Sequence, residues 1–412
     1  MTHPSILSLP RAAALPYSSP VCEREVRTSI LDFEASEWNG AVPCDEPQLR
    51  HDVLLAAQAS GLAINPHYVA VRRAGRIAGV AVLCDADIDL LTLAAPGAKK
   101  LAAKIRRGPL KRLGILKASS CGPVITNCRP NIALASWLPT GERPGVAREL
   151  VQEMNALSTG ALSVYFELDD AMCADFGAAL EAVGHTRGAS LPGTRLPIEW
   201  STFEEYVGDM RKLYRRAVRD DQRKARGLHI EVLSDFAHLA DDVFRLYSNV
   251  LERATTSFEM LTPAFFREFA GCENSRLVTA RLAETGELVG VELLLLGDSM
   301  VQDLYTGVDY RYNDEFAVYF NLVYPAIELA CARGDRFVST GQTSYKFKSR
   351  LGVEPFKLSI YAKHRNPVVN AVLRPLLPLL CPETKTMEHR VFKSEAHHVN
   401  TPPKAKAAGA ST

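Results

Sequence analysis

The chain alternates short apolar runs with longer segments in which apolar residues recur at helical spacing. Residues 67–85 and 276–298 are each predicted to form a pair of apolar strands joined at a turn that contains glycine. Helical segments precede each pair, and a further strand, a helix and a last strand follow it. Because the same order of elements occurs twice, the sequence predicts an α+β protein of two domains, each a mixed β-sheet flanked by helices.

The boundary between the two domains is expected near residues 192–200. The predicted division is a flexible N-terminus (1–20), a first domain (21–195), a second domain (196–365), and an apolar segment with a disordered tail (366–412). Residues 366–381 carry one charge and three prolines, so we expect this segment to be too broken for a long helix.

Composition and cysteine usage restrict the class of protein. The chain has 412 residues, of which 47% are hydrophobic and 23% charged, and this balance excludes a disordered chain, a collagen-like repeat and a polytopic membrane protein. Its nine cysteines are scattered without a CxxC pair, so neither a disulfide framework nor a metal site is expected. The N-terminus makes a poor signal peptide, and no run of about 18 apolar residues occurs. We therefore expect a cytoplasmic protein.

The net charge of +1 hides two strongly basic segments. Residues 211–226 contain eight Lys and Arg against Asp220 and Asp221, as in a solvated helix face or a cradle for phosphates. Residues 97–117 contain eight Lys and Arg, no acidic residue, and apolar residues between them, which favours an interfacial membrane anchor over a solvated loop or an RNA-binding patch. The residues predicted to contact the membrane are Lys99, Lys100, Lys104, Arg106, Arg107, Lys111 and Arg112.

Candidate chemistry gathers in the second half. Glu259 is an isolated carboxylate in an apolar loop, where it would be a base, an amine anchor or an ordinary surface residue. Strict alternation along the strand around residue 305 places four residues on one polar and aromatic face, which would be the wall of a site: Asp303, Tyr305, Gly307 and Asp309.

A dense polar loop follows the next predicted strand. Gly341 ends that strand, and Gln342, Tyr345, Lys346, Lys348 and Arg350 come within the following ten residues. An open sheet usually holds its ligand at the carboxyl ends of its strands, so this loop is expected to line the site.

These motifs carry a family resemblance. The sequence Y-T-G-V-D, an apolar helix that ends in A-R-G, and F-V-S-T-G-Q-T-S-Y-K-x-x-x-R-x-G-x-x-P-x-x-x-S resemble the GNAT-fold acyltransferases of the Fem-like class, often labelled peptidoglycan-biosynthesis or acetyltransferase proteins. The resemblance covers most of residues 200–365 by motif and the first half by architecture. It implies two tandem GNAT-like domains, the second catalytic, and acyl transfer to an amine with Asp309, Tyr345 and Lys346 as site residues.

One feature departs from the family pattern. Ordinary GNAT enzymes bind the pyrophosphate of CoA on a Q/R-x-x-G-x-G/A loop that opens a helix. This chain has DYRYNDEFA at the corresponding place, without glycine. Either the pyrophosphate is held differently, or the donor is not acetyl-CoA.

The first functional hypothesis is a cytoplasmic N-acyltransferase associated peripherally with the inner membrane. It would move a long acyl chain from acyl-CoA or acyl carrier protein to the amine of a lipid precursor. No tightly bound cofactor is expected. The basic anchor and apolar tail resemble those of bacterial ceramide synthases, which acylate a sphingoid base. Asp309 or Glu259 would be the base, Lys346 the oxyanion donor and Tyr345 the acid. The residues expected to bind substrate are Tyr305, Gln342, Lys348, Arg350, Arg215 and Arg216.

Two alternatives remain open. A Fem-type aminoacyl transferase would use aminoacyl-tRNA as donor and a peptidoglycan precursor as acceptor, and its basic clusters would bind the tRNA. A degenerate GNAT fold would bind lipid or cell wall without catalysis and would tolerate the loss of Lys346. DNA is not an expected partner of any of the three.

Overall fold

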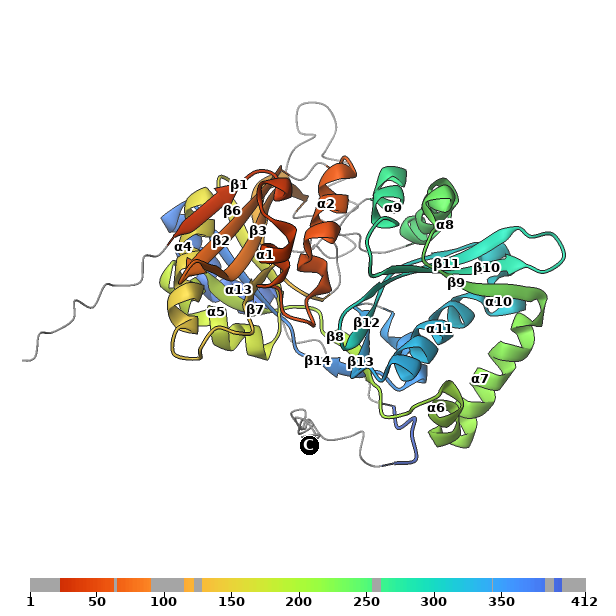
Figure 1. Cartoon of the computed structure of the whole chain (residues 1–412). Helices are drawn as coiled ribbons and strands as arrows, with labels where there is room; N and C mark the ends of the chain where they lie inside the picture. Colours follow the sequence, from red (N-terminus) through yellow and green to blue (C-terminus); the bar gives the residue numbers. More distant parts are fainter. Residues whose placement is uncertain are drawn as a thin grey trace, which may run out of the picture.

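The computed structural model describes residues 23–62, 65–89, 115–121, 128–253, 261–342, 344–381 and 389–394. These residues form two mixed sheets with helices on both faces, one sheet in each lobe of the molecule (Figure 1). The predicted α+β fold with two helix-flanked sheets is confirmed. Within the described ranges, every helix is too short or too polar to cross a membrane.

The first sheet has the order β1-β2-β3-β4-β6-β15-β7, and β5 pairs with β3. Its strands are β1 (Arg24–Arg27), β2 (Asn65–Arg73), β3 (Arg76–Asp89), β4 (Ile115–Cys121), β5 (Ile132–Leu134), β6 (Leu162–Leu168), β7 (Thr186–Ala189) and β15 (Ser359–His364). The helices around it are η1 (Ile30–Asp32), α1 (Ala35–Asn39), η2 (Pro47–Leu49), α2 (His51–Ala59), α4 (Arg143–Leu157), α5 (Asp170–Ala182) and α13 (Pro367–Leu380). Strands β4 and β6 run parallel, and the other pairs are antiparallel.

The second sheet has the order β14-β8-β13-β12-β11-β10-β9. Its strands are β8 (Gly193–Pro197), β9 (Leu228–Leu233), β10 (Ser275–Leu282), β11 (Leu288–Leu296), β12 (Met300–Val308), β13 (Phe337–Gly341) and β14 (Glu354–Phe356). Its helices are α6 (Phe203–Asp209), α7 (Lys212–Lys224), η5 (Ala225–Gly227), η6 (Ala237–Leu239), α8 (Ala240–Arg253), α9 (Pro263–Phe269), α10 (Tyr310–Phe316), α11 (Val318–Arg333), α12 (Tyr345–Lys348) and η7 (Ser349–Leu351). Here β12 and β13 form the parallel pair, in the position that β4 and β6 hold in the first sheet.

Each half completes its sheet with a strand from the other half. Strand β8 follows β7 closely in sequence but pairs with β13 and β14 of the second sheet. Strand β15 follows β14 but pairs with β6 and β7 of the first sheet. The sheets therefore do not divide at the predicted boundary between residues 195 and 196, because that boundary falls inside β8 and the predicted second domain includes β15.

The apolar segment after β15, expected to be too broken for a long helix, forms the 14-residue helix α13. Pro367 takes the first turn, where its missing N–H is harmless, and the side chain of Asn366 accepts hydrogen bonds from the next two backbone N–H groups. Leu373 and Leu377 pack against β6 and β15, and this burial offsets the two interior prolines. Helix α13 covers the same face of the sheet as α1 and α2, while α4 and α5 cover the other face (Figure 1).

The two halves share a hydrophobic core cluster. Helix α2 of the first lobe and helices α8 and α9 of the second contribute to one cluster, and α2 and α9 lie side by side (Figure 1). Below this cluster, Asp45 accepts hydrogen bonds from Ser299 at 2.6 Å and Arg336 at 2.9 Å. The shared cluster and the exchanged strands make the two sheets parts of one folded unit.

Glycine allows α8 to approach the second sheet closely. A Cβ atom on Gly307 would lie 2.8 Å from backbone atoms of Leu246 and Tyr247 in α8. On the opposite face, a Cβ on Gly290 would lie 2.5 Å from Val318 at the start of α11. The two glycines therefore set the spacing of the helices on both faces of β11 and β12.

We expect Gly307→Ala to lower the free energy of unfolding by about 1–3 kcal/mol, because the backbone of α8 must shift to admit the methyl group. Urea titration followed by circular dichroism measures this change. The control is Gly208→Ala in α6, where the added Cβ meets nothing within 4 Å. Equal stability of the two variants would contradict the close approach of α8.

Candidate active site

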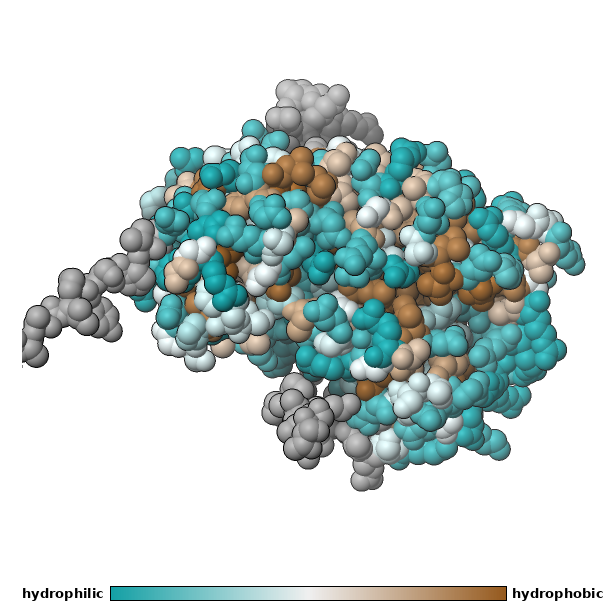
Figure 2. Space-filling view, viewed as in Figure 1, coloured by the Kyte–Doolittle hydropathy of each residue, from teal (hydrophilic) through white to brown (hydrophobic). Residues whose placement is uncertain are grey.

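A cavity of about 700 Å³ opens on the second sheet, between α8, the strands β12 and β13, and the first turn of α11. Residues from six helices, from strands β12 and β13 and from the loop before α12 line it. Among the residues that line the cavity are Asp221, Lys224, Tyr247, Asp303, Leu304, Tyr305, Tyr319, Phe320, Gln342, Phe347, Lys348 and Arg350. In Figure 2, brown apolar surface gathers below α8, and the teal surface of α7 lies beneath it.

The cavity lies where two parallel strands separate. The register of β12 and β13 covers three pairs, from Met300–Phe337 to Gln302–Ser339. Beyond these pairs both strands continue along the cavity wall, β12 with Asp303 to Thr306 and β13 with Thr340 and Gly341. A pair of strands that diverges presents backbone donors and acceptors to whatever fills the gap.

A β-bulge in β12 decides which side chains face each side of the sheet. Leu294 pairs with Asp303 and Leu293 pairs with Tyr305, so Leu304 is an extra residue in β12. Leu304 and Tyr305 consequently both pack toward the cluster under α8 and α9. The strict alternation that placed Asp303 and Tyr305 on one face is therefore wrong.

On the other face, Asp303 lies against the buried carboxyl group of Glu292. Glu292 is fully buried, and its Oε1 accepts a hydrogen bond from Thr306 Oγ1 at 3.0 Å. Burial, the charge of Asp303 and its hydrogen bond raise the pKa of Glu292 well above the usual range. The neutral form of the Glu292 carboxyl group is therefore favoured at this position beside the cavity.

Lys348 supplies the positive charge of this cluster. Its side chain is buried and donates hydrogen bonds to the backbone carbonyls of Thr340 and, at 3.1 Å, Gln342. Burial lowers the pKa of Lys348, while the nearby Asp303 and Glu292 raise it in part. The ammonium group thus fixes the end of β13 and lies near the carboxyl groups of Asp303 and Glu292.

Two cations lie at the α7 side of the cavity. Arg350 donates to Asp221 Oδ2 at 3.0 Å and stacks on the ring of Phe320, with its Cζ 4.0 Å from the ring centre. Tyr324 donates to the same carboxylate oxygen at 2.8 Å. Lys224 Nζ donates to the backbone carbonyl of Asp314 at 2.7 Å. These contacts give this end of the cavity fixed polar groups.

Two non-glycine residues in the cavity wall have left-handed backbone conformations. Ala317, between α10 and α11, has φ 50°, and Ser344, before α12, has φ 51°. Such conformations are unfavourable for residues with a Cβ and concentrate at functional sites. Gly341, at the end of β13, has φ 71°, which glycine adopts freely.

The structure brings four of the predicted substrate-binding residues to the cavity wall. They are Tyr305, Gln342, Lys348 and Arg350. Gln342 also donates a hydrogen bond to the backbone carbonyl of Leu191 at 2.7 Å, so its amide is held in place. Their roles toward a substrate stay predictions.

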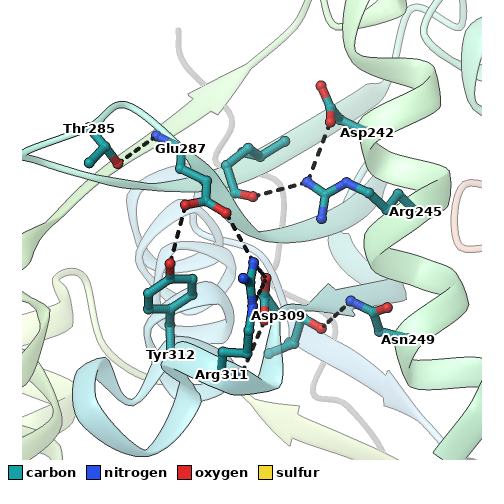
Figure 3. Close-up of polar contacts among 10 residues, drawn as sticks. Asp242, Arg245, Asn249, Thr285, Glu287, Asp309, Arg311 and Tyr312 are labelled. Carbon is teal, nitrogen blue, oxygen red and sulfur yellow. Dashed lines mark hydrogen bonds and ion pairs between the residues drawn. The ribbon is translucent and has the colours of Figure 1, made fainter.

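The predicted base Asp309 lies elsewhere. Its carboxylate caps α10, accepting from the backbone N–H of Arg311 at 3.0 Å, and pairs with the guanidinium of Arg311 at 2.6 Å. These hydrogen bonds lower the pKa of Asp309. Figure 3 shows Arg311 between Asp309 and Glu287, to which Tyr312 also donates. The observed contacts of Asp309 therefore belong to a cap and an ion-pair network, and it does not line the cavity.

Four other predicted site residues, Tyr345, Lys346, Arg215 and Arg216, are not among the residues that line the cavity. Tyr345 donates from its hydroxyl to the carbonyl of Pro192 at 2.7 Å. Lys346 is exposed on the opposite side of the short helix α12 from Lys348, because residues two apart point in nearly opposite directions. Arg215 donates to the carbonyl of Gly208, and Arg216 pairs with Asp220 on the surface.

Glu259 and the seven predicted membrane contacts (Lys99, Lys100, Lys104, Arg106, Arg107, Lys111 and Arg112) lie outside the described residues. Sequence reasoning missed Glu292 as a site residue and named Asp303 only as part of a polar face. The signal for Glu292 is a single carboxylate in the otherwise apolar run L-V-G-V-E-L-L-L-L. A lone buried acid of this kind needs a partner, and Asp303 with Lys348 supplies it.

Residues 208–349 match the family model described as acetyltransferase (GNAT) domain. This matched stretch, about a third of the chain, is a GNAT-type acetyltransferase domain. The protein is therefore an acyltransferase. GNAT enzymes use acyl-CoA as co-substrate, and their fold implies an acyl donor and an amine acceptor. The divergence of β12 and β13 and the bulge lie within this domain.

The fold likeness to one solved structure, FemX, extends over both halves of the chain. FemX has a TM-score of 0.56 at 12% identity, covering 85% of this chain and 100% of FemX. A tandem GNAT protein from the clavulanic acid biosynthesis pathway has a TM-score of 0.46 at 12% identity, covering 84% and 99%. The C-terminal domain of a putative lysylphosphatidylglycerol synthetase from Agrobacterium fabrum has a TM-score of 0.40 at 11% identity, covering 67% and 87%. Comparison with curated proteins gave no match.

The raised pKa of Glu292 has a measurable consequence for stability. The fold keeps this carboxyl group protonated at a pH where the unfolded chain ionises it, so stability falls as pH rises above the unfolded value of 4.5. Glu292→Gln removes this loss and keeps an acceptor for Thr306. We expect the difference in unfolding free energy, variant minus wild type, to increase from pH 4 to pH 8. Urea titration across this pH range measures it.

The control is Glu284→Gln, which alters an exposed carboxylate in the β10–β11 turn. It should show the pH profile of wild type. Parallel profiles for Glu292→Gln and wild type would show that Glu292 is ionised in the fold.

Proposed function

We propose that the protein transfers a long acyl chain from an acyl thioester to the primary amine of a lipid precursor, such as a sphingoid base in bacterial ceramide synthesis. The observation that carries this proposal is the cavity at the divergence of β12 and β13, which has an acid pair and a buried lysine at one side and aromatic and apolar walls at the other. Amide formation needs a proton acceptor, an oxyanion donor and room for both substrates.

Asp303 is the proposed general base. It lines the cavity beside Glu292, and the buried side chain of Lys348 places a positive charge near its carboxylate. The neutral amine nitrogen attacks the thioester carbonyl, a C–N bond forms, and Asp303 takes the proton from nitrogen. The C–S bond then breaks, and the thiolate leaves with a proton from solvent or from the base.

The bulge provides a candidate oxyanion donor. Because Leu304 is the extra residue of β12, its backbone N–H falls outside the regular ladder at the point where β12 and β13 separate. The ammonium of Lys348 lies at the same junction and would add positive charge. We therefore transfer the oxyanion role, expected for Lys346, to the bulge and Lys348.

The donor's phosphates would lie at the α7 side of the cavity. Lys224 and Arg350 line this end, next to the first turn of α11. The backbone N–H of Tyr319 in that turn donates to the side chain of Asn313, so a polar cap replaces the glycine-rich loop of ordinary GNAT enzymes. CoA and the phosphopantetheine of acyl carrier protein both carry phosphate and fit this chemistry.

The walls favour an apolar acyl chain or acceptor tail. Tyr247, Val250, Leu251 and Phe320 line the cavity, and Phe347 extends the apolar wall to the surface with 53% of its side chain exposed. Burying such surface against a hydrocarbon chain is favourable by roughly 25 cal/mol per Å². The basic segment 97–117, by its sequence, would bring the protein to the inner leaflet where such an acceptor resides.

A second candidate is a Fem-type aminoacyl transferase that acts on a peptidoglycan precursor. The fold likeness to FemX over both halves of the chain favours it. The basic helix α7 would then bind the phosphates of aminoacyl-tRNA. The two candidates share an amine acceptor and differ in the donor.

We expect Asp303→Asn to lower the turnover number by about 10²–10⁴-fold with a smaller change in KM, because the amine loses its proton acceptor. Single-turnover amide formation from a long-chain acyl-CoA and an amino alcohol in detergent micelles measures the effect. The matched control is Asp309→Asn, which can still cap α10 and should keep turnover near wild type. A similar loss in both variants would return the base role to Asp309.

We expect a strain that lacks the gene to lose an amide-linked lipid and to accumulate its free-amine precursor. Comparative lipidomics of the deletion strain, with complementation by wild type and by Asp303→Asn, measures this outcome. An unchanged lipid profile with altered muropeptides, together with RNase-sensitive activity in extracts, would favour the aminoacyl transferase.

A further inference from the structure

Helix α13 turns an apolar stripe toward solvent. Four of its residues are exposed over a large part of their surface and follow one another at spacings of one, three and four residues, so they lie along one side of the helix. They are Val368 at 72%, Val369 at 45%, Val372 at 56% and Leu376 at 42% exposed. Arg374 is the one ionisable residue in the sequence of α13. A soluble protein rarely exposes such a continuous stripe without a partner for it.

The inner side of α13 is firmly attached to the first sheet. Asn370 is buried, accepts from the backbone N–H of His364 at 2.9 Å and donates to the carbonyl of Gly184 at 3.0 Å. Leu377 is buried against β6 and β15. The outer stripe is therefore held in a fixed orientation, and the helix has little freedom to turn it inward.

A basic groove adjoins the first turn of α13. It has a volume of about 470 Å³ and is lined by Lys117, Thr159, Ala161, His364, Arg365 and Asn366. The side chains of Lys117 and Arg365 are exposed, and the lining contains no carboxylate. Asn366 belongs to both features, since it lines the groove and caps α13.

We propose that α13 and this groove form a docking surface for an anionic phospholipid bilayer. The apolar stripe would lie among the upper parts of the acyl chains, and Lys117 and Arg365 would contact lipid phosphates beside it. Apolar residues bordered by cations are the combination that binds a negatively charged membrane surface. A protein partner fits this surface less well. Protein interfaces are enriched in aromatic residues, Met and Arg, whereas the stripe is aliphatic and α13 carries no acidic residue.

The sequence that precedes Lys117 is also rich in basic residues, which complement an anionic membrane surface. Residues 90–114 lie outside the described residues, and their sequence contains seven of the eight Lys and Arg of segment 97–117. The chain returns to the first sheet at Ile115, two residues before Lys117 in the groove. In sequence, the basic segment therefore leads directly into the strand that carries Lys117.

Vesicle flotation of the full chain tests the proposal without donor or acceptor, so its outcome is independent of the proposed catalytic function. The protein should bind vesicles of phosphatidylcholine with phosphatidylglycerol and bind far less to phosphatidylcholine alone. The double variant Val368→Glu/Val372→Glu should lose most of the binding. Lys117→Glu/Arg365→Glu should weaken it by at least about fivefold for each charge.

Matched controls separate this surface from general effects of charge. Leu31→Glu changes an apolar side chain that is 64% exposed on η1, and Arg267→Glu reverses a charge on α9 whose side chain is 51% exposed. Both controls should bind as wild type does, and all variants should keep the wild-type unfolding transition. Undiminished binding of Val368→Glu/Val372→Glu would overturn the proposal.

The same variant distinguishes a second copy of the chain as the occupant. Light scattering after size-exclusion chromatography gives the oligomeric state of wild type and variant. A dimer that becomes a monomer in Val368→Glu/Val372→Glu, with vesicle binding unchanged, would assign the stripe to self-association and overturn the bilayer proposal.

Discussion

The site depends on the separation of β12 from β13 and on the buried charges that occupy the junction. Two parallel strands that pair over three residues would close further along if their backbone groups could meet. Lys348 occupies this junction instead: its ammonium group donates hydrogen bonds to the carbonyls of Thr340 and Gln342 and lies near the carboxyl groups of Asp303 and Glu292. A buried charge is tolerable only with such partners, so cavity and charge cluster require each other.

The extra residue in β12 turns this opening into a place for chemistry. By placing Leu304 and Tyr305 on one face, the bulge leaves Asp303 on the other, beside Glu292. The aromatic side chain of Tyr305 joins the packing beneath α8, while the acid stays at the cavity with the lysine. Gly307 then allows α8 to pack closely on β12. Within five residues, β12 therefore supplies the carboxyl group of Asp303, the apolar wall at Leu304 and Tyr305, and the close contact with α8 at Gly307.

The sequence predicted the repeated order of elements and the polar loop after β13, because hydrophobic period and turn residues are local signals. Tyr305, Gln342, Lys348 and Arg350 line the cavity, as that loop and strand suggested. The exchange of β8 and β15 between the sheets could not be predicted from local sequence signals, because the pairing partner of a strand is set by the whole fold. Asp303 and Asp309 were indistinguishable in a strictly alternating strand, and only the bulge and the Arg311 ion pair separate them.

Net charge is a poor guide to the partners of this protein, because what matters is whether each cation already has a carboxylate. On α7, Arg216 and Arg223 pair with Asp220, and Arg219 pairs with Glu204, so much of this basic helix is neutralised within the fold. The residues that line the groove beside α13 include Lys117 and Arg365 and no carboxylate, although Asp87 is opposite Lys117 in the β3–β4 ladder and Asp85 accepts a hydrogen bond from Thr159. A chain of net charge +1 can therefore place two exposed cations along one groove. The helix beside this groove also carries the exposed stripe of α13, so hydrophobic and electrostatic attraction to a membrane would act at the same place.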